Sequence, residues 1–234
     1  IASDKNVAPA ALRLLKKSPE NAAPALSELL SNMPRNYNTI NISGWVVDAA
    51  TALLRIFKST DSSIRGAGII IVKEVVLRMA NIQLDGESNT INIEVTALNT
   101  FINAFVLAVT GKPPIGILSD VDSKRDLMKA MVVAGTVLVG WAKSNIISGR
   151  SSSNSSNFNS DTISAIVNLI EGLTTAASKE QGAVREQGLT ASIIWSLYLH
   201  SSIVENVGSD DEDNIKAVAA NTKCSTVISN LFKT

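Results

Sequence analysis

The sequence predicts an all-α fold of eight or nine helices, and three observations support this prediction. Apolar residues follow the helical period along most of the chain, whereas only Ile91 to Val95 alternates like a strand. The composition is 45% hydrophobic but only 4% aromatic, which favours a core of Ile, Leu, Val and Ala packed helix on helix. At least one loop is short enough to join antiparallel helices as a hairpin.

We therefore expect one helical domain over residues 1–234, arranged as an irregular α-solenoid or as a compact bundle. A flexible break, if there is one, is expected at residues 148–160. Each helix is predicted from its apolar spacing together with capping residues at its ends. In chain order, the predicted helices cover about residues 10–17, 22–31, 43–57, 62–79, 95–109, 122–141, 161–177, 182–204 and 209–231.

Capping and breaking residues set the ends of the first five helices. In the second helix, Pro24 fits only within the first turn, where no backbone hydrogen bond is lost. Ser43 can cap the third helix, and Asp61 or Ser62 can cap the fourth. Pro113 and its neighbours end the fifth helix.

The later helices are bounded in the same way. Asp122 or Ser123 is expected to cap the sixth helix, Asp161 the seventh and Ser209 the ninth. Because Ile71 and Leu138 lie at the middle of long apolar stripes, we expect both in the core.

The start of the fourth helix resembles a known repeat family. Asp61-Ser62-Ser63-Ile64-Arg65-Gly66-Ala67-Gly68 is similar to the D-x-x-V-R-x-x-A opening of helices in HEAT and armadillo-type repeats. Gly182-Ala183-Val184-Arg185-Glu186-Gln187-Gly188 is similar too, with Gly where the repeat has Ala and no Asp at its start. The resemblance implies a superhelical stack whose concave face holds another protein.

The charges argue against nucleic acid as a partner. The chain has 21 basic and 21 acidic residues, and no run of Lys or Arg could follow a phosphate backbone. The marked cluster, Asp210 to Asp213, could be a cation site. The better interpretation is a helix N-terminus, where carboxylates offset the helix dipole.

Few residues offer catalytic chemistry. The chain has one His and one Cys, which excludes a Cys/His zinc cluster and an intrachain disulfide. His200 could act as a base only with partners brought from elsewhere, and Cys224 has no C-x-x-C partner, so we interpret both as structural or surface residues. No catalytic, cofactor-binding or metal-binding residues are predicted.

Two further patterns have structural explanations. Asp120, Asp122 and Asp126 could be calcium ligands, but Lys124 and Arg125 interrupt the loop, so capping by Asp122 or Ser123 is preferred. Glycines occur within or beside several predicted helices, where Gly costs about 1 kcal/mol relative to Ala. Close helix approach explains them better than access for a ligand; they are Gly66, Gly68, Gly135, Gly140, Gly182 and Gly188.

The compartment stays open at this point. The run from Met131 to Trp141 is shorter than the ~20 residues of a membrane span. A chain that starts at Ile1 is expected to be a processed form or a piece of a longer protein. The sequence does not decide the compartment: the cytoplasm is favoured over secretion, which stays an alternative because the chain starts without Met and Asn41 and Asn154 lie in glycosylation sequons.

The sequence thus predicts a non-enzymatic helical scaffold or structural protein. Its expected partner is another protein or a second copy, bound through a helix-lined surface. The alternative is a secreted or membrane-active helical protein that binds an apolar ligand or lipid, because apolar faces are wide at Met131 to Trp141 and Ile193 to Leu199.

Overall fold

The described part of the chain is helical and contains no strand, which confirms the all-α class. The computed structural model describes residues 13–14, 17–32, 52–53, 55–84, 102–103, 106, 120–147, 160–204, 222, 225–226 and 229. Its five helices are α2 (Pro19–Asn32), α4 (Ser62–Leu84), α6 (Val121–Ile147), α7 (Ser160–Ser178) and α8 (Gly182–Val204). The other predicted helices, and the extended segment Ile91 to Val95, lie wholly or mostly outside these residues.

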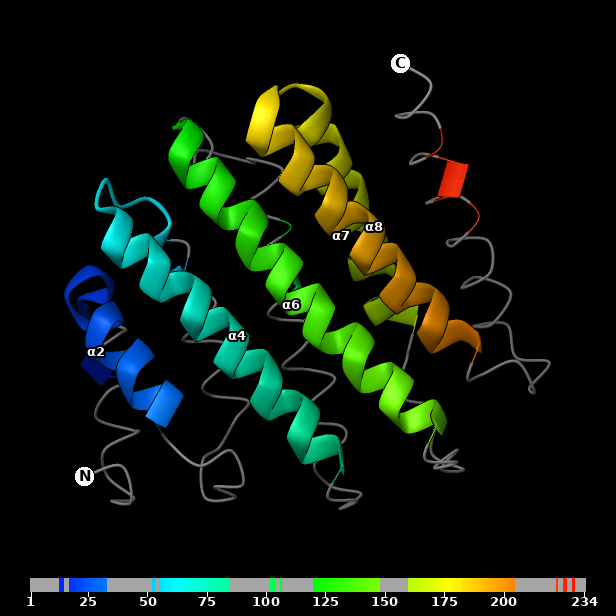
Figure 1. Cartoon of the computed structure of the whole chain (residues 1–234), viewed down its shortest axis with the longest axis horizontal. Coiled ribbons are helices and arrows are strands. Elements are labelled where there is room, and N and C mark those ends of the chain that lie inside the picture. Colours follow the sequence, from blue (N-terminus) through cyan, green and yellow to red (C-terminus); the bar gives the residue numbers. More distant parts are fainter. Residues whose placement is uncertain are drawn as a thin grey trace.

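Four of the helices form one layer. α2, α4, α6 and α8 lie side by side in that order, and α7 packs behind α8 (Figure 1). The main contacts join neighbours only: α2 with α4, α4 with α6, α6 with α8, and α7 with α8. α4, α6 and α8 run in the same direction and have their first turns toward the same end of the layer (Figure 1). Corresponding turns of the three helices therefore lie at similar heights.

Helix α4 follows the preceding helical residues after a short turn, as predicted. Phe57 and Lys58 form the turn, and the Asp61 carboxylate caps the helix by accepting a hydrogen bond from the Ser63 N–H at 2.8 Å. A Cβ atom added at Gly68 would lie 2.8 Å from Ile56 Cγ2. The two arms of the hairpin therefore approach closely because residue 68 has no side chain.

Glycine has the same use where α8 meets its neighbours. A Cβ atom at Gly135 of α6 would lie 2.6 Å from Ile194 Cγ2, and one at Gly188 would lie 2.8 Å from the Cβ of Ala177 in α7. Close helix approach is thus confirmed at three of the six glycines. Gly66 and Gly140 face open space, and Gly182 begins α8 with a φ of +59°.

Buried aromatic residues join α8 to the layer. Trp195 donates a hydrogen bond from Nε1 to the carbonyl oxygen of Met131 at 3.0 Å. Its ring meets Tyr198 edge to face, with centroids 6.0 Å apart. The predicted core positions Ile71 and Leu138 are also buried, at 0% and 3% exposure.

Three predicted helix starts need correction. Pro24 lies in the second turn of α2, because the helix already begins at Pro19, which occupies the first position where Pro is well tolerated. The cap of α6 is Asp120, whose Oδ2 accepts hydrogen bonds from the Ser123 N–H at 2.9 Å and its hydroxyl at 2.7 Å. Helix α7 begins at Ser160, so Asp161 is inside the helix.

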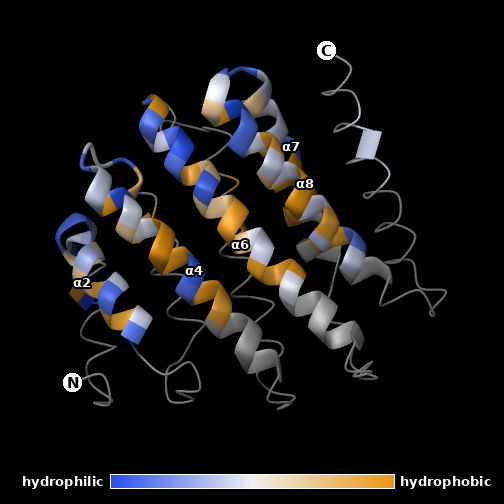
Figure 2. Cartoon of the chain, in the orientation of Figure 1, coloured by the Kyte–Doolittle hydropathy of each residue, from blue (hydrophilic) through white to orange (hydrophobic). Residues whose placement is uncertain are grey.

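None of the described helices combines the length and the apolar character needed to cross a bilayer. Hydrophobic stretches occupy the middle of α4, α6 and α8, whereas hydrophilic residues predominate in the first turn of α6 (Figure 2).

Neighbouring isoleucines of α4 provide a test of this packing. Ile71→Ala is expected to lower the free energy of unfolding by about 2–5 kcal/mol, because it removes a fully buried side chain and leaves a cavity. Ile70→Ala removes the same atoms from a side chain that is 41% exposed, and should cost less than about 1 kcal/mol. Urea titration measures both values, and equal losses would show that the assigned core face is wrong.

Candidate functional site

A buried ion pair joins α4 to α6. Arg65 Nε lies 2.9 Å from Asp126 Oδ2, and Arg65 Nη1 donates to the carbonyl oxygen of Ser59 at 2.8 Å. The two charged side chains are only 4% and 9% exposed. Burial of an arginine is costly unless its charge is paired and its N–H groups are bonded, and both conditions are met here.

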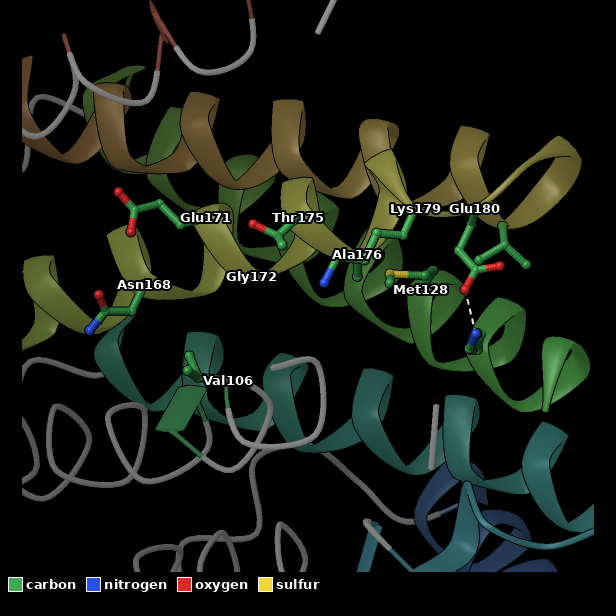
Figure 3. A pocket seen from close by; sticks show the side chains of 11 residues that line it. Val106, Met128, Asn168, Glu171, Gly172, Thr175, Ala176, Lys179 and Glu180 are labelled. Carbon is green, nitrogen blue, oxygen red and sulfur yellow. Dashed lines mark hydrogen bonds and ion pairs between the residues drawn. The ribbon is translucent and has the colours of Figure 1, made fainter. Parts of the chain in front are cut away.

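A second ion pair at the corresponding place joins α6 to the turn before α8. Arg65 is the fourth residue of α4, and Lys124 is the fourth residue of α6. The Lys124 ammonium pairs with Glu180 (dashed line in Figure 3). Both pairs connect the N-terminal ends of successive helices, so they hold α4, α6 and α8 with their first turns at one end of the layer.

The three aspartates around the start of α6 have three separate structural roles. Asp120 caps the helix, Asp122 pairs with Arg125 at 2.8 Å, and Asp126 pairs with Arg65. The segment therefore caps a helix, as predicted, but the capping residue is Asp120 and not Asp122 or Ser123. Among the described residues, no three His, Cys, Asp or Glu side chains are grouped so that they could hold a metal ion.

Hydrogen bonding lowers the pKa values of the two capping carboxylates, Asp61 and Asp120. The hydrogen bond from the Ser63 side chain, helped by the Ser63 N–H, lowers the pKa of Asp61 below its ordinary 3.8. The hydrogen bond from the Ser123 hydroxyl, helped by the Ser123 N–H, likewise lowers the pKa of Asp120 below 3.8. Each carboxylate is therefore a better cap when it is ionised.

A cavity of about 520 Å³ lies where α6 meets α7 and the turn before α8 (Figure 3). Helix α7 contributes Asn168, Glu171 and Thr175 to its lining, and α6 contributes Met128. Of its charged lining residues, Lys124 and Glu180 are paired with each other. The cavity lining combines apolar, amide, hydroxyl and charged groups of both signs.

The residues weighed for chemistry in the sequence do not meet at this cavity. His200 lies exposed near the end of α8, and it is not among the residues that line the cavity. Cys224, the sequon residues Asn41 and Asn154, and the acidic cluster Asp210 to Asp213 lie outside the described residues.

A different feature is shared by three helices. On α4, α6 and α8, partly or fully exposed residues recur at the same four helix positions, with spacings of four, three and four residues, which places them on one stripe of each helix. Neighbouring helices cover the sides of this layer, and α7 covers the back of α8, so the stripes form a common surface, here called the open face. The open face consists of Gly66, Ile70, Lys73 and Leu77, of Arg125, Lys129, Val132 and Thr136, and of Glu186, Thr190, Ile193 and Leu197.

Large apolar side chains are exposed on the open face. Ile70 is 41% exposed, Ile193 36% and Leu197 50%. These are three of the five large apolar side chains exposed in the described part of the chain; of the others, Val121 lies one turn before Arg125 on α6, and Leu14 lies before α2. The sequence predicts Ile193 and Leu197 as part of a wide apolar face, but Ile70 is not among the predicted residues; its signal is the stripe from Gly66 to Leu77.

Comparison of the chain with protein-family models, with curated proteins and with solved structures found no match in any of the three.

The buried ion pair can be tested with a matched pair of aspartates. Asp126→Ala is expected to lower the free energy of unfolding by about 3–5 kcal/mol, because Arg65 would remain buried without a counter-charge. Asp122→Ala breaks an ion pair whose carboxylate is 56% exposed, and should cost about 0–1 kcal/mol. Chemical denaturation gives both values, and a small loss for Asp126→Ala would mean that the pair does not hold the two helices together.

The cap at Asp120 predicts a pH dependence. Because folding lowers the pKa of Asp120, its stabilising effect is present above its ordinary pKa of 3.8 and is lost as the pH falls through the lowered folded value. Asp120→Asn keeps an acceptor for the cap but cannot titrate. Its unfolding midpoint should lie below that of the wild type near neutral pH, because the ionised cap is missing, and should approach the wild-type value as the pH falls below 3.8. Identical slopes in thermal melts would contradict this role.

Proposed function

We propose that this protein is a non-enzymatic helical scaffold that binds another macromolecule through the open face. The observation that carries the proposal is the alignment of exposed apolar side chains across parallel helices. Ile70 on α4 and Ile193 and Leu197 on α8 are exposed on the same side of one layer, with half-buried Val132 on α6 between them. Contiguous exposed apolar surface with polar residues around it is typical of protein interaction sites.

The architecture proposed with this function is an irregular α-solenoid of eight or nine helices joined as hairpins. In its support, each helix of the layer makes its main contacts with the next one, as in stacked repeats. The repeated cation at the fourth position of α4 and α6, each paired with an acid of the following element, also fits a repeated unit. The resemblance of the residues after Asp61 to HEAT and armadillo-type repeats agrees with this proposal.

The proposed function is tested by removing the apolar side chains of the open face. In the full chain, Ile193→Ser with Leu197→Ser is expected to reduce the recovery of a partner protein from its source cells by about tenfold or more, because apolar anchors dominate such interfaces. Quantitative mass spectrometry of proteins retained by the immobilised chain measures this recovery.

The matched control is Leu14→Ser, which removes another exposed large apolar side chain, 59% exposed, from a segment outside the open face. This control should retain the partner. Equal loss in both variants would contradict an interface at the open face. Extractable lipid bound to the wild type, or leakage of vesicles in its presence, would instead support the apolar-ligand or membrane-active alternative.

A further inference from the structure

Two lysines lie among the apolar side chains of the open face. Lys73 is exposed on α4, three residues after Ile70, and forms no ion pair with any residue in the described part of the chain. Lys129 on α6 is 46% exposed and lies 3.9 Å from Asp126 Oδ1. Since Asp126 already pairs with Arg65 at 2.9 Å, it compensates Lys129 only weakly.

Carboxylates that could balance these lysines are missing from the middle of the open face. On α4, α6 and α8, the exposed acids with described side chains are Asp122 and Glu186, which lie within the first two turns of α6 and α8. The other acids of α4 and α6 whose side chains are described, Glu74 and Asp126, are buried at 5% and 6% exposure. The middle of the open face therefore presents apolar groups together with cations.

We propose that the open face binds an acidic polypeptide segment. Its apolar side chains would pack on Ile70, Ile193 and Leu197, and its carboxylates would pair with Lys73 and Lys129. This inference rests on the proposed function and names the chemistry of the partner. Opposite charges across an interface favour the right partner and speed its association. A phosphate backbone fits less well, because two lysines set among apolar groups do not form the basic stripe that follows a nucleic acid.

The test uses two synthetic helical peptides with the same leucine pattern. One carries Glu at the positions beside the leucines, and the other carries Lys at those positions. Fluorescence anisotropy with the full-length protein is expected to show that the Glu peptide binds about tenfold more tightly at low salt. This preference should shrink as salt shortens the screening length from about 10 Å at 0.1 M to about 3 Å at 1 M.

Charge variants assign that preference to the two lysines. Lys73→Glu with Lys129→Glu should abolish the preference. Lys73→Gln with Lys129→Gln should reduce the preference, and this variant replaces the first one if charge reversal harms folding. The matched control, Lys17→Glu with Lys58→Glu, makes the same change of net charge at exposed positions outside the open face and should keep the preference.

Several results would overturn the inference. These are equal binding of the two peptides, no binding of either peptide, or equal loss of the preference in the control. Tighter binding after Asp210 to Asp213 are replaced by Ser would mean that the chain's own acidic cluster occupies the face. Concentration-dependent dimers in sedimentation that disappear in the lysine variants would mean that a second copy of the chain occupies the open face. If the serine variants lose their cellular partner while the lysine variants keep it, the inference fails and the proposed function stands.

Discussion

The guanidinium of Arg65 can lie between α4 and α6 only with a carboxylate beside it, and the rest of the described layer depends on that requirement. Asp126 provides the charge, and the carbonyl oxygen of Ser59 accepts a second hydrogen bond. These partners come from two different elements, so they restrain both the height at which the helices meet and the turn that leads into α4. Lys124 and Glu180 extend the same arrangement to the entrance of α8.

The arrangement of the helix starts also explains why a surface can form from three separate helices. When parallel helices begin at one end of a layer with matching rotation about their axes, equal helix positions lie on the same side of the layer. The exposed positions recur in step on α4, α6 and α8. Glycine permits the close approach of α6 and α8, because a side chain at Gly135 would collide with Ile194. The open face is therefore a consequence of how the helix starts are held, and half-buried Val132 also packs against the core behind it.

Sequence reasoning succeeded where the signal was local. The starts of α4 and α8 and the burial of Ile71 follow from capping, glycine and apolar spacing. It chose the wrong cap for α6 because Asp120, Asp122 and Ser123 are all good capping residues within four positions. It had no means of pairing Arg65 with Asp126, since 61 residues separate them and nothing local links a buried arginine to its acid. It overlooked Ile70 because three consecutive isoleucines conceal which one faces outward.

Contacts restricted to neighbours have a consequence for how the protein opens. Among the described helices, α2 is joined to α6 chiefly through α4, and α4 is joined to α8 chiefly through α6. Detachment of α2 therefore leaves the joints from α4 to α8 intact, and loss of α8 leaves α2, α4 and α6 together. The described layer is thus divided into separately opening units, with the lowest opening free energies at its two edges and the highest around α4 and α6.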